Sequence, residues 1–198
     1  MHNFNLIAAN VALGFIICGL YLRFKTKGQD SVSPFIFLGL FICGSATLIQ
    51  DERNFAFFFL VNLFWLPLAF DDYFTKSVSL QALLIATTAT IATVFVFQEN
   101  TLSYMLIWSS ILLALRICVA VFETLFGKQL VGGADYIAAF ALISTLKSNL
   151  LGYWLIFFSL LGILHAVKQN NKTAQIPLIP FMLAGWALTF AISSAGSS

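Results

Sequence analysis

Three aspartates stand beside long apolar segments, where a carboxylate could do chemistry at a membrane surface: Asp71, Asp72 and Asp135. A charged side chain costs about 2.5–3.5 kcal/mol at the centre of a bilayer and less near its surface, so such residues are candidates for function. Two carboxyls held close together share one proton, and such a pair can activate water without a metal. The pattern therefore predicts acid–base hydrolysis, provided that the fold brings two of these carboxyls together.

Asp135 follows Gly132, Gly133 and Ala134, and this small-residue motif opens an apolar segment. Glycine permits close backbone approach or a positive φ, so a substrate strand could lie near the carboxylate. A flexible turn with a helix cap is the alternative, because aspartate favours helix N-termini. Asp71 is an alternative to Asp72 as the carboxyl that pairs with Asp135. Adjacent residues of a helix point about 100° apart, so only one of the two can readily face Asp135.

The composition requires a lipid environment for most of the chain. Of 198 residues, 60% are hydrophobic and 9% charged, whereas soluble domains have about 25% charged residues. The net charge of +2 gives no indication of a nucleic-acid partner. The three cysteines lie in apolar runs without C-x-x-C spacing, which predicts small buried side chains: Cys18, Cys43 and Cys118. Neither a metal site nor a cofactor is predicted.

Continuous apolar runs predict an all-α, polytopic bundle of eight membrane-spanning helices. We expect them at residues 5–22, 34–50, 54–70, 79–97, 101–125, 134–147, 150–167 and 176–194. Two N-terminal helices (residues 1–53) would precede a six-helix core (54–198) that carries the aspartate motifs.

Basic residues in the loops set the predicted orientation, because cytoplasmic loops of membrane proteins are enriched in lysine and arginine. Seven of them follow the odd-numbered segments: Arg23, Lys25, Lys27, Lys76, Lys128, Lys168 and Lys172. That side is predicted to be cytosolic, with both termini on the other side of an inner (cytoplasmic) membrane. Asp72 and Asp135 then lie at the cytosolic face. His2 and His165 lie on opposite sides and cannot share a metal ion.

Three stretches, in matching order over residues 72–185, resemble the type IV prepilin and archaeal preflagellin peptidases, which are membrane aspartyl peptidases of the GxGD type. The segment DYFTKSVS at 72–79 is similar to the family pattern D-x-x-T-[RK]-x-I-[PS]-N. The segment GGAD at 132–135 is similar to G-x-G-D and its G-G-A-D variant. The segment IPLIPFMLAG at 176–185 resembles the proline-rich entry into the family's last helix. The chain departs from the family patterns at three places. Ser79-Leu80 replaces the usual Pro-Asn, Ala134 replaces the second glycine of G-x-G-D, and Ile137 replaces a frequent lysine.

The resemblance implies that Asp72 and Asp135 form the catalytic pair and that Gly132, Gly133 and Ala134 shape the active-site turn. It implies prepilin or pseudopilin precursors as substrates, cut after a short basic leader beside an apolar helix. The zinc-binding loop of many bacterial members is missing, so methylation of the new N-terminus is not expected.

Other residues near the motifs have structural and functional interpretations. Arg116 and Glu123 share a helix face, which predicts a salt bridge; Glu123 could instead bind a basic leader. Lys76 is a membrane anchor or a modulator of the aspartate pair, and Asp71 is an alternative to Asp72. Two other functions stay open: a small transporter, and a catalytically inactive assembly subunit of a pilus or secretion system.

Overall fold

The computed structural model describes residues 16–23, 33–97, 101–126, 132–169 and 176–195, together with residues 11, 13 and 14. Within these ranges the chain forms helices and no strand. Their order is α2 (Ser33–Ala46), α3 (Glu52–Thr75), α4 (Leu80–Phe97), α5 (Thr101–Phe126), α6 (Gly133–Ile143), the short 3₁₀ helix η1 (Ser148–Leu150), α7 (Leu151–Gln169) and α8 (Ile179–Ala195). Residues 16–23 belong to a helix that precedes α2. The all-α prediction is confirmed for the described part of the chain.

Three of the described helices are long and apolar enough to cross a membrane: Glu52–Thr75, Leu80–Phe97 and Met105–Leu125. At 1.5 Å per residue, the 24 residues of α3 extend about 36 Å, which exceeds the roughly 30 Å of bilayer hydrocarbon. These helices correspond to the predicted spans 54–70, 79–97 and 101–125. They indicate a membrane protein, and we treat α3, α4 and α5 as its membrane-spanning segments.

The remaining predicted spans correspond to shorter apolar helices where they are described. The helix predicted over 134–147 is α6, which has 11 residues and ends at Ile143. After Ile143 the backbone forms a tighter turn, in which the N–H groups of Thr145 and Leu146 donate to the carbonyls of Leu142 and Ile143, three residues earlier. At about 16 Å, α6 is too short to cross the hydrocarbon layer alone. The total of eight spans stays a prediction, and residues 5–10, 12 and 15 of the segment 5–22 lie outside the description.

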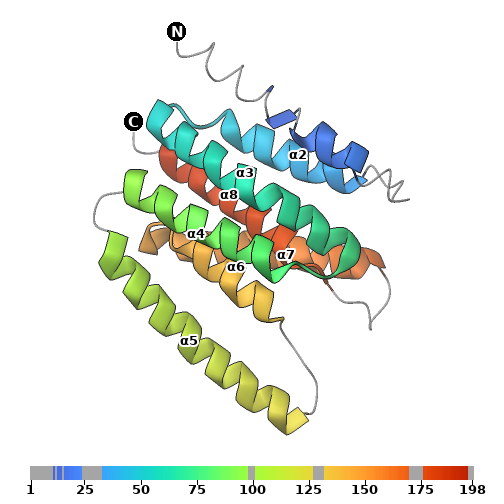
Figure 1. Ribbon diagram of the computed structural model, residues 1–198, viewed down its shortest axis with the longest axis vertical. Coiled ribbons are helices and arrows are strands. Elements are labelled where there is room, and N and C mark those ends of the chain that lie inside the picture. The colour runs from blue at the N-terminus through green and yellow to red at the C-terminus, as the bar shows by residue number, and fades with distance from the viewer. Residues whose placement is uncertain are drawn as a thin grey trace.

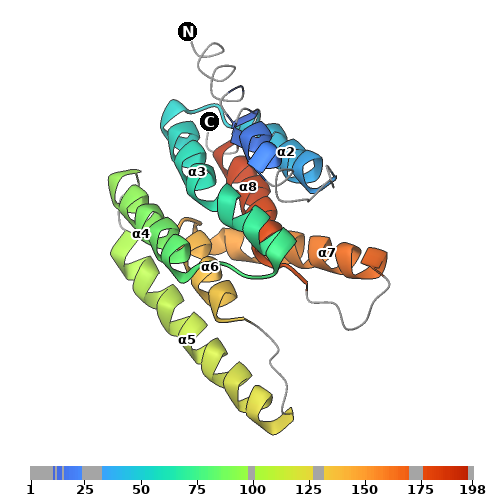
Figure 2. The same ribbon diagram turned by 45° about the vertical axis from the view of Figure 1, so that its right-hand side comes forward.

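Helix α8 forms the centre of the bundle (Figures 1 and 2). It packs against α2 and α3 and against α6 and α7. Thirteen of the 17 residues of α8 are buried, which agrees with a sequence that is apolar on all faces. Helix α5 lies at the outer edge of the bundle, next to α6. The α2 helix packs directly on α8 of the predicted six-helix core.

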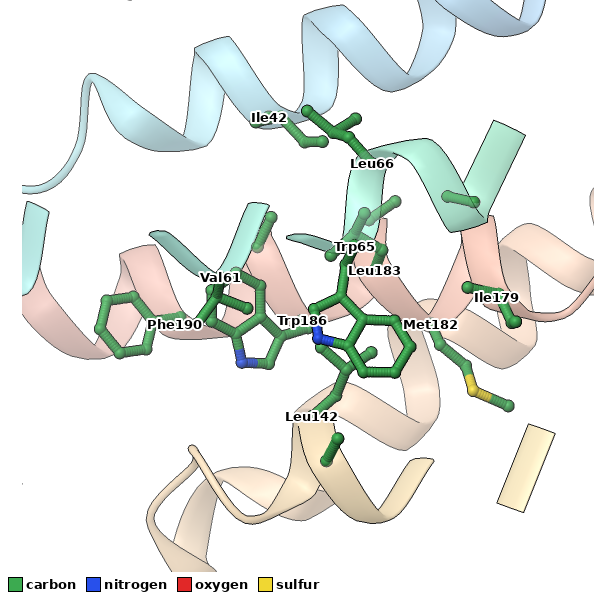
Figure 3. Close-up of a cluster of buried hydrophobic side chains, with 14 of the residues drawn as sticks. Ile42, Val61, Trp65, Leu66, Leu142, Ile179, Met182, Leu183, Trp186 and Phe190 are labelled. Atoms are coloured by element: carbon green, nitrogen blue, oxygen red, sulfur yellow. The ribbon is translucent and has the colours of Figure 1, made fainter. Parts of the chain in front are cut away.

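Aromatic side chains from α3 and α8 form the middle of the core (Figure 3). Trp186 stacks on Phe58, with ring centroids 5.5 Å apart, and on Phe190 at 5.4 Å. Two indole N–H groups in this part of the core have acceptors: Trp65 donates to the Thr90 hydroxyl at 2.8 Å, and Trp186 donates to the Thr145 hydroxyl. These bonds remove the cost of burying polar donors in an apolar interior.

The prediction that all three cysteines are buried is wrong. Cys18 and Cys118 are exposed on the surface of their helices, and Cys43 is half-buried. An apolar run on an outer helix of a membrane protein can face lipid, so a small apolar side chain there needs no protein core around it.

Candidate active site

The C-terminal end of α3 positions Asp71 and Asp72. The helix begins after Asp51, whose carboxylate accepts a hydrogen bond from the Asn54 N–H at 2.8 Å, a typical N-cap. It ends at Lys76, which adopts the left-handed conformation with φ 54° and donates its N–H to the Asp72 carbonyl. Because the helix continues to Thr75 and not only to residue 70, both aspartates lie in its last turns.

The Asp72 carboxyl contacts the start of α8. Its Oδ2 accepts a hydrogen bond from the N–H of Ile179, the first residue of that helix, at 3.1 Å. The first N–H groups of a helix have no partner within the helix and carry partial positive charge, so a carboxylate is stabilised there. This bond joins two of the three stretches that carry the family resemblance, residues 72–79 and 176–185.

Asp135 lies in the first turn of α6. Its Oδ2 accepts a hydrogen bond from the Gly132 N–H at 3.1 Å, and its own N–H donates to the Gly132 carbonyl. A Cβ atom at position 132 would lie 3.0 Å from that Oδ2, so glycine permits the carboxyl to approach. Gly132 has φ −68°, so it provides space and not a positive φ. A Cβ atom at position 133 would have no neighbour within 4 Å, and Ala134 is half-buried.

The two carboxyls are close enough to interact electrostatically, although 63 residues separate them in the sequence. The pKa of Asp135 is raised to about 6, first by burial and second by the negative charge of Asp72, while the Gly132 N–H acts in the opposite direction. Like charges in a partly buried site favour a pair that keeps a proton. Each carboxyl uses Oδ2 for its backbone hydrogen bond; no described donor bonds to the Oδ1 of either one.

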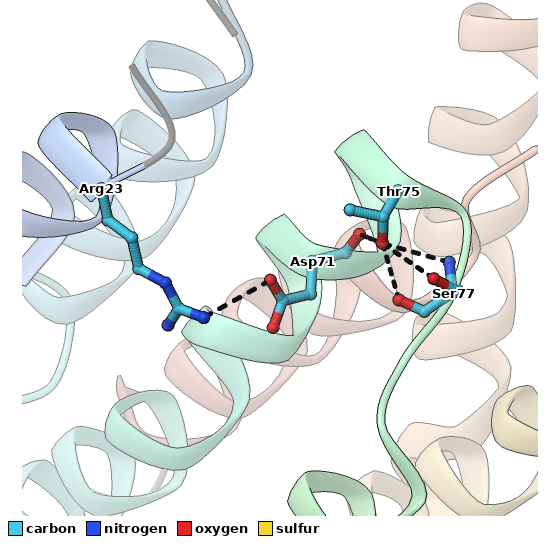
Figure 4. A network of polar contacts seen from close by, with 4 residues as sticks. All are labelled: Arg23, Asp71, Thr75 and Ser77. Carbon is cyan, nitrogen blue, oxygen red and sulfur yellow. Dashed lines mark hydrogen bonds and ion pairs between the residues drawn. The ribbon is translucent and has the colours of Figure 1, made fainter. Parts of the chain in front are cut away.

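Asp71 points to a different neighbour (Figure 4). Its Oδ1 lies 4.0 Å from the guanidinium of Arg23, on the helix before α2, and the Asp71 side chain is 26% exposed. The Asp71 carbonyl accepts a hydrogen bond from the Thr75 hydroxyl at 2.7 Å. The choice of Asp72 over Asp71 stays a prediction, and this geometry supports it, because only Asp72 contacts α8 and interacts with Asp135.

The two other supporting candidates lie in different places. Lys76 interacts electrostatically with Asp72, and its ammonium lies 5.4 Å from the centroid of the Tyr73 ring. Glu123 lies on α5, where its Oε2 is 2.9 Å from a guanidinium nitrogen of Arg116. The predicted salt bridge is therefore confirmed. Arg116 also lies over the ring of Tyr136 at 5.2 Å, so the ion pair connects α5 to the residue next to Asp135.

No protein-family model, curated protein or solved structure matches this chain. The resemblance to the prepilin peptidases therefore rests on the three short stretches alone.

A cavity beside Asp135 was not foreseen from the sequence. It has a volume of about 360 Å³ and lies between α5, α6, α7 and the start of α8. Asp135 is the only carboxylate among the described residues that line it, and the others are mostly aliphatic or aromatic. The signal in the sequence is an apolar stripe on α5 that includes Trp108, Leu112 and Val119, at helical spacing.

No described group of three or more histidine, cysteine, aspartate or glutamate side chains could hold a metal ion. His165 packs between the rings of Tyr73 and Phe181, with centroid distances of 5.7 and 5.1 Å. His2 lies outside the described residues, as do four of the basic residues that set the orientation: Lys25, Lys27, Lys128 and Lys172.

Proposed function

We propose that this chain is a multi-pass aspartyl endopeptidase of the inner membrane that removes the leader of prepilin-like precursors at the cytosolic face. The observation that supports the proposal is the electrostatic interaction between Asp72 and Asp135, two carboxyls from separate helices. Each keeps one oxygen without a described hydrogen bond while the other is fixed by a backbone N–H. The arrangement provides two oriented carboxyls, one of which, Asp135, lines an apolar cavity.

The proposed hydrolysis uses one proton that the two carboxyls share. The ionised carboxyl accepts a proton from water as the water oxygen bonds to the scissile carbonyl carbon. The protonated carboxyl gives its proton to the carbonyl oxygen, which forms a tetrahedral diol. The C–N bond then breaks as one carboxyl protonates the leaving nitrogen and the other takes the proton of a diol hydroxyl. The pair returns to its starting state, with one proton, and needs no covalent intermediate.

An inactive assembly subunit is the second candidate, and one observation favours it. Both carboxyls accept hydrogen bonds at the start of a helix, as purely structural caps do. In that case the aspartates would hold α6 and α8 in place and perform no proton transfer.

Substitution by asparagine separates the two functions, because asparagine caps helices about as well as aspartate but cannot act as a general acid or base at these positions. The chain would be co-expressed with a precursor that has a short basic leader, a glycine and an apolar helix, and the products would be sequenced from the N-terminus. We expect Asp72→Asn and Asp135→Asn each to abolish cleavage at normal expression. Asp71→Asn is the matched control and should cleave as the wild type does. Cleavage by either of the first two variants would contradict the proposal.

A further inference from the structure

Arg116 is a charged residue inside a membrane-spanning helix, and the proposed hydrolysis does not use it. It stands near the middle of the candidate span Met105–Leu125, where a charge is costly and is usually kept for a function. Its guanidinium donates to the Glu123 Oε2 at 2.9 Å and lies over the Tyr136 ring on α6, 5.2 Å from the centroid. The guanidinium is therefore directed at the bundle, whereas a membrane anchor would extend toward the lipid headgroups.

The turn that carries Asp135 is weak by its own sequence. It opens with Gly132, Gly133 and Ala134, and glycine loses the most backbone freedom when a turn becomes ordered. The first N–H groups of a helix also have no partner within the helix. A Cβ atom at position 133 would meet nothing within 4 Å, so no neighbour packs closely there. Tyr136 is the first large side chain of α6 and directly follows Asp135, so a contact that holds its ring also holds the turn.

Helix α5 reaches this turn through Arg116. After Trp108 no described side chain of α5 is fully buried, and α6 is the helix that α5 chiefly contacts (Figure 2). On the side toward α7 the helix borders the cavity instead. A guanidinium within about 6 Å of an aromatic centroid is attracted to the face of the ring, more strongly away from water. The contact between Arg116 and Tyr136 thus joins the second half of α5 to the start of α6.

We propose that Arg116 is a positioning residue for the catalytic pair: with its charge balanced by Glu123, it holds the Tyr136 ring and thereby fixes the first turn of α6, which carries Asp135. The assignment rests on the proposed peptidase function. Arg116 touches no reacting atom in this role; it acts through Tyr136 on the orientation of the Asp135 carboxyl. The ion pair of α5 then has a function other than anchoring in lipid or binding a basic leader.

Arg116→Met tests the role of the charge, because it keeps an unbranched side chain. We expect kcat for the precursor to fall by about tenfold to a hundredfold with KM unchanged, since a displacement of about 1 Å at a reacting group has effects of this size. Arg116→Lys keeps a cation and should recover most of the lost kcat. Ile117→Met is the matched control, because Ile117 is 57% exposed on another face of α5, and it should cleave as the wild type does.

Two results would overturn the positioning role while leaving the peptidase function intact. One is cleavage by Arg116→Met at the rate of the wild type. The other is a higher KM with kcat unchanged, which would show that the ion pair binds the substrate leader.

Substitution of Tyr136 tests whether Arg116 acts through the ring. Tyr136→Leu removes the ring and should lower kcat by the same factor as Arg116→Met, whereas Tyr136→Phe keeps a ring and should retain most of the rate. The double variant Arg116→Met/Tyr136→Leu should be no slower than either single variant, because both remove the same contact. Multiplication of the two losses in the double variant would contradict the coupling.

The pH profile separates positioning from a general loss of folded protein. Burial and the charge of Asp72 raise the pKa of Asp135 to about 6. A loosened turn exposes this carboxyl to water, so its pKa should fall and the upper limb of the kcat profile should move to lower pH in Arg116→Met. The Ile117→Met profile should not move. A lower kcat in Arg116→Met with an unshifted profile would count against the assignment.

Amide hydrogen exchange provides a measurement that does not depend on cleavage. In lipid nanodiscs, residues 133–137 of Arg116→Met and Tyr136→Leu should exchange about tenfold faster than in the wild type, because the turn opens more often. Arg116→Lys and Ile117→Met should exchange at the rate of the wild type. Faster exchange confined to this turn supports the coupling even where the wild type shows no cleavage and the peptidase proposal fails. Unchanged exchange in Arg116→Met overturns the inference.

Discussion

Asp72 and Asp135 cap helices and also form the proposed catalytic pair. Placing two carboxyls within electrostatic range of each other is unfavourable, especially when both are partly buried. Each is bonded to a backbone N–H at the start of a helix, Asp72 to Ile179 and Asp135 to Gly132. The partial positive charge of these helix termini offsets part of the repulsion. The same bonds fix the orientation of each carboxyl, as a catalytic pair requires.

The raised pKa of Asp135 predicts how stability depends on pH. Because its folded-state pKa, about 6, lies above the ordinary value of 3.8, the folded state binds the proton more tightly than the unfolded state. The contribution to stability is therefore full below about pH 4 and is lost as the pH rises to about 6. We expect Asp135→Asn, which does not ionise, to gain stability relative to the wild type across this window, measured as unfolding temperature in detergent.

The Asp72→Asn variant is the control for that measurement. It removes the negative charge that contributes to the raised pKa of Asp135. The pH window in which ionisation of Asp135 destabilises the protein should then become narrower and end at a lower pH. A difference between wild type and Asp135→Asn that stays constant from pH 4 to 7 would show that Asp135 titrates normally.

Lys76 has both a strained backbone and a charge near Asp72. A non-glycine residue in the left-handed region is disfavoured by about 1–2 kcal/mol, and glycine is not. We therefore expect Lys76→Gly to stabilise the protein by about 0.5–1 kcal/mol, after allowance for the greater freedom of glycine in the unfolded chain. Lys76→Gln removes the charge and keeps the strain, so it should show no such gain. Equal unfolding free energies for Gly and Gln variants would contradict this explanation.

At the scale of helices, the contact between α7 and α8 depends on a glycine. A Cβ atom at Gly185 would lie 3.0 Å from the Phe158 nitrogen and 3.1 Å from its Cβ, so the backbones approach closely there. Gly185→Ala should force the two helices apart and cost about 1–3 kcal/mol in unfolding experiments. Gly162→Ala on α7 is the matched control, because its Cβ would meet nothing within 4 Å; it should be neutral or stabilising by up to about 1 kcal/mol.

The existence of most helices could be predicted from the sequence, and their ends could not. The apolar run 54–70 predicts the centre of α3 but not its end at Thr75, because hydropathy falls at the first charged residues, Asp71 and Asp72. The helix continues through them to Thr75 and ends where Lys76 adopts the left-handed conformation and donates its N–H to the Asp72 carbonyl. In the other direction, α6 ends earlier than hydropathy indicates, because the backbone changes after Ile143 to a turn with hydrogen bonds three residues back, which hydropathy does not register.

At the scale of the molecule, the motifs named the candidate residues but not their environment. The spacing of residues 72 and 135 contains no information about distance; the packing of α3, α6 and α8 brings the two carboxyls into interaction. The contact between Asp72 and Ile179 was equally unpredictable, since 107 positions separate the two residues. The cavity depends on how far α5 stands from α7, which no local pattern determines. The stripe on α5 could be recognised, but a stripe of this kind normally packs on a neighbouring helix.

The orientation of α3 in the membrane decides whether the carboxyls face the cytosol. Gln50 and Ser77 are exposed and flank this helix at its two ends. Single cysteines would be placed at either position in a chain whose three native cysteines are changed to alanine, and intact cells would be treated with a membrane-impermeant maleimide. Because basic residues favour the cytosolic side, we expect position 50 to react in intact cells and position 77 only after permeabilisation. The reverse pattern would put Asp72 outside, away from any cytosolic leader, and labelling of both positions in intact cells would show that α3 does not cross the bilayer.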